Sequence, residues 1–267
     1  MKFSATTIAA LAAIVALAAC TAPVHSDTLR LTQPVVLLGE VHDHPGQHAL
    51  RLQAFSNALA QGARPALALE QFDRDKQGAL DALRSAQPAP DAQALIAVAG
   101  ASGWEWDYYR PFIALALQHG LPVVAANVSR EEARRVMREG LAATGFDARV
   151  PADLLAAQTE GIEASHCGML PPGVAPKMAL SQVARDQFMA RVVQTHAARG
   201  VVLLAGNSHV RTDVGVPRWL DDATRRRSVA IGVLEEGDTT TAFDRIVRTA
   251  VHPRPDPCLG FKPPKPR

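Results

Sequence analysis

The sequence has few of the residues that usually carry cofactor or nucleic-acid chemistry. Its 267 residues include only three cysteines and two tyrosines, and aromatic residues make up 5% of the chain. The net charge is only +2 and no basic run is interleaved with aromatics, which argues against nucleic-acid binding. The zinc motif HExxH and the attachment motif CxxCH are both absent, so no metal is indicated and covalent haem attachment is not expected.

Long apolar runs are also missing, apart from one at the N-terminus. A positive charge at Lys2 precedes the apolar residues 9–19, which end in Leu17-Ala18-Ala19-Cys20. This run is too short to span a bilayer comfortably, because a span needs about 20 residues. The pattern is typical of a bacterial secretory signal, and its end resembles the lipobox of bacterial lipoproteins. We therefore expect a lipoprotein signal peptide over residues 1–19, lipidation of Cys20 and a linker over residues 20–33.

The residue after this cysteine predicts the destination of the protein. Thr21 is not the aspartate that retains many lipoproteins at the inner membrane. We therefore expect an exported protein, anchored by lipid to the outer membrane and facing the periplasm. An exported compartment permits a disulfide, and Cys167 and Cys258 remain available. The sequence does not decide between a bridge and a Cys167 that serves the functional site.

Short apolar runs alternate with helical patterns over residues 34–251. Strands are predicted at 35–38, 66–69, 122–125, 201–205, 229–234 and 243–249, with helices starting at Pro45 and over 111–119 and 177–199. This alternation predicts an α/β domain with an open, mostly parallel sheet and helices on both faces. Residues from about 129 to 199 are predicted to form an inserted helical subdomain. The segment 252–267 is rich in proline and lysine and is predicted to be a disordered tail.

Polar residues follow four of these predicted strands. They are Glu40 and His42 after the first strand, Glu70 at the end of the second, Asn127 and Arg130 after the third, and Asn207 and His209 after the fourth. In open parallel sheets the carboxyl ends of the strands meet at one edge, where ligands bind. We therefore expect Glu40, His42, Glu70 and His209 to share one pocket. A carboxylate beside an imidazole can orient a general base, although a buried polar network is the structural alternative.

Neighbouring segments supply further candidates for this pocket. Gln182 and Asp186 share one face of the predicted helix 177–199, near the polar edge. His48 lies on the apolar face of the helix that begins at Pro45, and His44 is expected to cap that helix. Arg211, like Arg130, is a candidate for holding an anionic group.

Several short motifs stand in a recognisable order along the chain. They are residues 38–43, 68–73, 103–111, 126–127, 166–168, 185–190 and 206–211. Together they resemble the ChaN-like family of haem-binding uptake lipoproteins, and the match covers nearly the whole mature chain. The family implies an iron-linked bacterial lipoprotein that binds haem as a homodimer. It belongs to a wider group with the erythromycin esterases and the TIKI and TraB proteins, whose members are described as hydrolases or proteases. The resemblance therefore leaves a hydrolase that uses Glu40, His42, Glu70 and His209 as the alternative function.

For haem, the expected iron ligand is a tyrosine. Tyr108 and Tyr109 lie beside Trp104, where a porphyrin face could stack, and a phenolate suits ferric iron. Tyr109 is preferred because it matches the tryptophan-to-tyrosine-proline pattern of the family, and we expect it in a loop before a helix that starts at Pro111. Two alternatives stay open: the aromatic cluster is part of the core or a lid, or His166 in the inserted region holds the iron.

Overall fold

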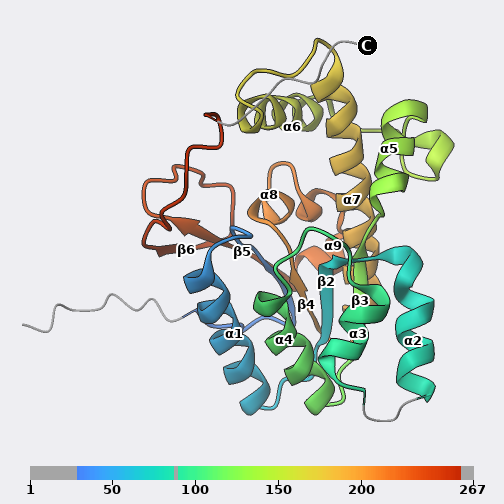
Figure 1. The fold of residues 1–267 in the computed structure, drawn as a ribbon, viewed down its shortest axis with the longest axis vertical. Coiled ribbons are helices and arrows are strands. Elements are labelled where there is room, and N and C mark those ends of the chain that lie inside the picture. The colour runs from blue at the N-terminus through green and yellow to red at the C-terminus, as the bar shows by residue number, and fades with distance from the viewer. Residues whose placement is uncertain (1–28, 87–89, 260–267) are drawn as a thin grey trace, which may run out of the picture.

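The computed structural model of the protein describes residues 29–86 and 90–259 (Figure 1). The predicted signal peptide, the lipidated Cys20 and the first part of the predicted linker therefore lie outside the described residues. Within the described part, no helix combines the length and the apolar character that a membrane span requires.

Six strands form one open sheet in which every neighbouring pair is parallel. In chain order they are β1 (Val35–Leu38), β2 (Ala66–Asp73), β3 (Val123–Asn127), β4 (Val201–Leu204), β5 (Ser228–Glu235) and β6 (Arg245–Thr249). Their order across the sheet is β3-β2-β4-β1-β5-β6. The central strands β1 and β4 are buried at every residue, as expected for apolar strands covered on both faces. The predicted parallel α/β sheet is confirmed.

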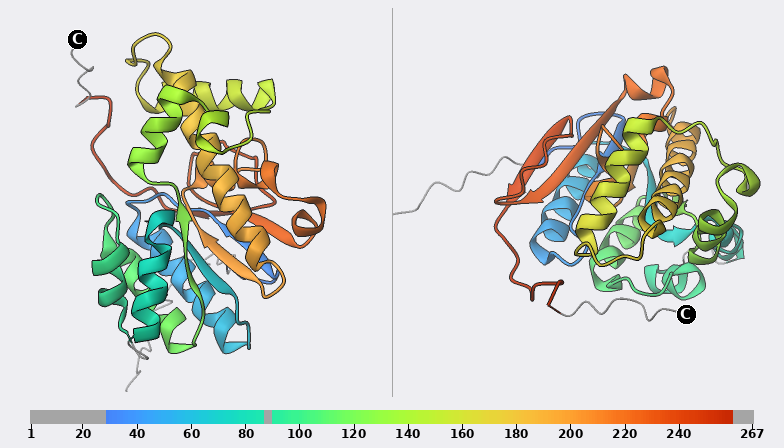
Figure 2. Two further views of the ribbon diagram at one scale, coloured as in Figure 1. Left: turned by 90° about the vertical axis from the view of Figure 1, so that its right-hand side faces the viewer. Right: turned by 90° about the horizontal axis from the view of Figure 1, so that it is seen from above.

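Helices cover both faces of the sheet, as Figure 2 shows. One face is covered by α1 (Pro45–Ala60), α2 (Gln77–Ala86), α3 (Ala92–Ala99) and α4 (Trp106–Gln118). The helices that follow in the chain are α5 (Arg130–Glu139), α6 (Ala152–Ser165), α7 (Val174–His196), α8 (Asn207–Val210) and α9 (Asp222–Arg225). Of these, α7 packs Met189 and Val193 against the second face. Pro45 occupies the first turn of α1, and the side chain of His44 caps the helix by accepting from the Gln47 N–H, as predicted.

The neighbouring strands β1 and β4 send their connections to opposite faces of the sheet. The chain leaves β1 into α1 on the first face and leaves β4 into α8, whose Val210 packs on the second face. Such a switch point opens a crevice at the carboxyl ends of the strands, where ligands bind. The two turns are also bonded to each other, because the Asn207 N–H donates to the Glu40 carbonyl at 2.9 Å.

The predicted insertion shares its longest helix with the sheet domain. The N-terminal half of α7 contributes Val183 and Ala184 to a small core of its own, together with α5 and α6. The C-terminal half of α7 lies on the sheet. Helix α5 is capped by Ser129, whose hydroxyl accepts from the Glu132 N–H. Helix α7 ends three residues earlier than predicted, at His196, and the positive φ of Gly200 then turns the chain into β4.

The aromatic cluster corrects one prediction about the fold. Tyr108 and Tyr109 lie in the first turn of α4 and not in a loop, and Pro111 sits inside this helix instead of starting it. Tyr109, Phe112, Ile113 and Ala116 are all buried against the sheet. Their spacing is the i, i+3, i+4, i+7 pattern of a helix packed on a core, and this pattern begins before the proline.

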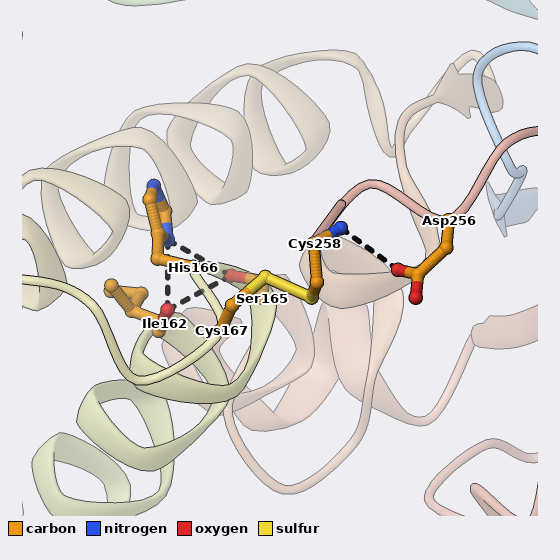
Figure 3. Close-up of a disulfide and its surroundings, with 6 residues drawn as sticks. All are labelled: Ile162, Ser165, His166, Cys167, Asp256 and Cys258. Carbon is orange, nitrogen blue, oxygen red and sulfur yellow. Dashed lines mark hydrogen bonds between the residues drawn. A yellow bond between two sulfur atoms is a disulfide. The ribbon is translucent and has the colours of Figure 1, made fainter. Parts of the chain in front are cut away.

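The beginning of the predicted disordered tail is held in place. Cys258 forms a disulfide with Cys167, 91 residues earlier, in the turn that follows α6 (Figure 3). Arg254 pairs with Asp43 in the turn after β1 and with Glu235 at the end of β5. The bridge that the sequence left undecided is therefore present, and residues 252–259 cross the carboxyl edge of the sheet. Closing a loop of this length contributes up to about 4.6 kcal/mol in the chain-entropy account.

Candidate functional site

A cavity of about 510 Å³ opens at the carboxyl ends of β1 to β4. Of the residues predicted for the pocket, the side chains that line it are His42, Glu70, Asn127, Arg130, Gln182 and His209. Trp104, from the loop before α4, forms part of the wall. The structure therefore brings together residues that are up to about 170 positions apart in sequence, because four strand ends meet at one edge.

Glu40 lies beneath the cavity, and three side chains donate hydrogen bonds to its carboxylate. It is buried, and its carboxylate accepts hydrogen bonds from the Arg51 guanidinium, the Tyr109 hydroxyl and the His42 ring. Burial disfavours the charged carboxylate, but Arg51 and then His42 outweigh this effect and lower the pKa of Glu40 to about 2. Glu40 is therefore an anion at neutral pH and can only accept hydrogen bonds.

His42 stands on Glu40 and reaches the cavity. Its Nδ1 lies 2.7 Å from the Glu40 carboxylate, so Nδ1 carries the hydrogen and the neutral ring presents the lone pair of Nε2. The side chain is 47% exposed, and the edge of Trp104 packs against it. Burial disfavours the imidazolium, but the hydrogen bond to Glu40 and the charges of Glu70 and Glu40 raise the pKa of His42 above its ordinary value. This arrangement is that of an oriented base.

His209 is held differently, between two carboxylates. Its Nδ1 lies 2.6 Å from Asp186 and its Nε2 lies 3.4 Å from Glu70. Burial disfavours the charged ring, but Glu70 and Asp186 outweigh it and raise the pKa of His209 to about 10. The ring is therefore an imidazolium at neutral pH with both N–H groups engaged. Of the two histidines that line the cavity, the geometry favours His42 as a base.

Backbone groups connect the two sets of residues. The Gly206 N–H donates to Glu70 at 2.8 Å, and a side chain at this position would bring its Cβ within 2.9 Å of the His42 ring. The close approach of His42 therefore requires a glycine here. Asn127 donates to the Glu70 carbonyl and accepts from Arg185, which fixes the far side of the cavity.

Several predicted residues lie outside the cavity. Asn207 is bonded to the backbone of Val233 in β5, and Arg211 pairs with Asp213. His48 lies behind the site, where it contacts the His42 carbonyl at 2.9 Å and stacks on Tyr108. His166 is at the end of α6 beside the disulfide, bonded to the Ile162 carbonyl (Figure 3).

Tyr109 is buried under the cavity. Its hydroxyl donates to Glu40, and burial together with the Glu40 charge raises the pKa of Tyr109 well above its ordinary value. Tyr108 is only partly buried and has its ring stacked on His48, with the centroids 4.4 Å apart.

The cation on which the site depends was not among the residues predicted from sequence. Arg51 lies on α1, one turn after His48, and its side chain is fully buried beside Glu40. An arginine between apolar positions of a helix is usually read as a residue whose head reaches solvent. Arg51 could have been predicted from the fact that a buried carboxylate such as Glu40 requires a cationic partner. In the part of the chain that the structure describes, no group of three or more His, Cys, Asp or Glu residues is arranged to hold a metal ion.

The fold and the site define a class of protein: a parallel α/β protein with a Glu- and His-lined cavity at the switch point of its sheet. Comparison with protein families gives a match over residues 30–220 to the family described as haem-binding uptake, Tiki superfamily, ChaN. This chain belongs to that family, which confirms the resemblance seen in the sequence. Comparison with curated proteins brings no significant match.

The chain is also similar in fold to several solved structures. ChaN of Campylobacter jejuni, whose structure is described as showing cofacial haem binding, matches with a TM-score of 0.64 and 23% identity over 78% of this chain and 84% of that chain. An erythromycin esterase, EreC, matches with a TM-score of 0.44 and 12% identity over 77% and 71% of the two chains. The type III effector HopBA1 matches with a TM-score of 0.43 and 14% identity over 82% and 88%.

We predict that the contribution of His209 to stability depends on pH. Its pKa is about 10 in the folded protein and about 6.5 in an unfolded chain. A raised pKa stabilises the fold fully below the unfolded value, and this contribution is lost as the pH rises through the folded value. The difference in unfolding free energy between the wild type and His209→Gln should therefore be larger near pH 6.5 and shrink as the pH rises towards 10. Chemical denaturation at several pH values measures it, and a constant difference would contradict the charged state of His209.

Proposed function

We propose that the protein is a haem-binding protein of an uptake system, exported and anchored to a membrane by lipid on Cys20. The observation that supports haem binding is the family match over residues 30–220, which spans all of the cavity-lining residues. ChaN of Campylobacter jejuni, with its cofacial haem binding, supports the same ligand. We extend haem binding to this chain as part of the proposal, together with the homodimer that the family resemblance implies.

The aromatic groups beside the cavity offer contacts for a haem. Trp104 lines the cavity and is only partly buried. Tyr108 follows four residues later in the first turn of α4, is partly buried, and stacks on His48 beside the lining residues. The indole offers a face or edge for a porphyrin, and the phenol is a known type of ligand for ferric haem iron. Bound haem would supply a ferric centre that can be passed on to the next protein of an uptake system.

The structure changes which tyrosine is the better candidate for the iron ligand. The sequence favoured Tyr109, but ligation by Tyr109 would require its phenol to leave Glu40 and the core. It would also have to lose its proton against the charge of Glu40, which raises its pKa. Tyr108 would only have to leave the ring of His48. We therefore propose Tyr108 as the ligand, with Tyr109 and His166 as the residues that the test must separate from it.

A titration with hemin tests this proposal. The purified protein should develop a Soret band and a ferric spectrum of the high-spin tyrosinate type. Tyr108→Phe should lose this spectrum, whereas Tyr109→Phe should keep it and unfold more easily because Glu40 loses a donor. Loss of the spectrum in Tyr109→Phe alone would make Tyr109 the ligand. Loss only in His166→Ala would move the haem to the turn after α6, and no Soret band in any variant would refute haem binding.

The lipid anchor has its own test. Cys20→Ala should leave the protein unlipidated, because alanine has no thiol to which the lipid can be attached. The variant should then be released into the soluble fraction of the periplasm, whereas the wild type should fractionate with the outer membrane. Membrane fractionation with immunodetection measures this, and normal retention of the Cys20→Ala variant in the membrane would rule the anchor out.

One observation favours a hydrolase as the second candidate. His42 is oriented by Glu40 and presents Nε2 towards the cavity, where it could take a proton from an attacking water. Glu70 and the charged His209 would hold the polar floor on which the substrate lies, and Asp186 would keep His209 in place.

This candidate predicts a rate with a defined pH dependence. A general base must be neutral, so the turnover of ester or peptide substrates should rise with pH through the pKa of His42, which lies above its ordinary value. His42→Asn should abolish turnover, and the matched change His119→Asn, outside the cavity lining, should leave it unchanged. If His42→Asn turns substrate over like the wild type, the cavity is not hydrolytic in this way.

A further inference from the structure

Two arginines of the cavity have no carboxylate partner. Among the described residues, the other arginines near the site are paired, Arg51 with Glu40 and Arg211 with Asp213. Arg130 lines the cavity, is exposed, and makes no side-chain hydrogen bond or ion pair within the described residues. Arg185 is partly buried and donates only to neutral acceptors, the Asn127 amide and the Val128 carbonyl. Both guanidinium groups therefore keep N–H groups and a full charge for a ligand.

The other charges in the cavity do not cancel these two. Glu70 is already bonded to the Gly206 N–H and to the His209 imidazolium. Asp73 also lines the cavity, but among the described residues no ion pair joins it to either arginine. Its carboxylate and Arg185 interact only at longer range. The wall formed by α5 and α7 is thus cationic, while the floor formed by the strand ends is a closed network.

The same wall also offers a hydrogen-bond acceptor without a partner. The side-chain oxygen of Gln182, on α7 one turn before Arg185, is buried and makes no hydrogen bond. A buried polar atom without a partner is costly, because it has lost its hydrogen bonds to water. A ligand that carries an O–H or N–H group beside its anionic group would satisfy this oxygen and the two arginines together.

We infer that the cavity binds the carboxylate or phosphate group of a ligand between Arg130 and Arg185. Arginine recognises such groups because its planar guanidinium matches their oxygen atoms. The carboxylate could belong to a haem propionate or to a separate small anion, and these two sources share the chemistry that the wall recognises. The site depends neither on the identity of the iron ligand nor on hydrolysis.

The test uses matched charge changes in the full-length protein. Arg130→Ala removes one of the two cavity arginines, and Arg134→Ala removes an exposed charge from the same helix without touching the cavity lining. Calorimetric titration with inorganic phosphate and with succinate measures the free-anion arm. Titration with hemin and with hemin dimethyl ester, which lacks free carboxylates, measures the propionate arm. At Arg185 the change is to lysine, because complete removal of this side chain would disturb Asn127. Arg185→Lys keeps the charge but not the forked geometry of the guanidinium.

The inference predicts a weakening of about tenfold to a hundredfold in Arg130→Ala in one of the arms, with less than a twofold change in Arg134→Ala. A loss for phosphate or succinate with unchanged hemin affinity identifies a separate small anion. A loss for hemin but not for its dimethyl ester identifies the propionates. Equal affinities of Arg130→Ala and Arg134→Ala for every probe would overturn the inference. Hemin binding that survives in all variants would leave the proposed haem-binding function standing. Binding of phosphate or succinate without any binding of hemin would refute the proposed function and leave the anion site standing.

Discussion

The site depends on a buried ion pair between Arg51 and Glu40. Both side chains are fully excluded from solvent, and a carboxylate in such a place would normally take up a proton. The guanidinium keeps Glu40 ionised, and the ionised carboxylate then accepts hydrogen bonds from His42 and Tyr109. Because the partners come from α1, α4 and the turn after β1, one charge joins two helices to the edge of the sheet. Removal of either member would leave the other charge buried and unpaired, at a cost of about 3–5 kcal/mol.

The two histidines of the cavity show how position decides chemistry. His42 has one carboxylate neighbour and an open side, so it keeps a lone pair towards the cavity. His209 has a carboxylate on each side and stays charged. The first can accept a proton or a metal centre, whereas the second only shapes the electrostatic field of the floor. The two sets meet at Gly206, where only a hydrogen atom fits beside the His42 ring.

The parts of this architecture that the sequence predicted are those set by local pattern. Apolar runs such as 35–38 and 201–204 are too short for a helix and favour buried strands, and polar residues directly after them share an edge if the strands are parallel. What the sequence could not predict depends on contacts between distant elements. The sequence alone does not distinguish Arg51 from a surface arginine of an amphipathic helix. Its role follows only from its contact with the buried carboxylate of Glu40. The Cys167–Cys258 pairing likewise depends on how far residues 252–259 cross the molecule. The misplaced start of α4 has a local cause, since Pro111 was given more weight than the helical spacing of Tyr109, Phe112 and Ile113.

The charged groups at this edge are expected to form one coupled unit, and a double-mutant cycle across Glu70 and His209 tests this most directly. The two side chains are 3.4 Å apart and shielded from solvent, so each single change removes a charged partner that the other has in the wild type. The free energies of unfolding of Glu70→Gln, His209→Gln and the double variant, measured by denaturant titration at pH 6, give the coupling. The structure predicts that the double variant loses less than the sum of the single losses, by more than about 1 kcal/mol. Losses that add within about 0.5 kcal/mol would contradict the coupled unit and leave Glu70 and His209 as independent neighbours.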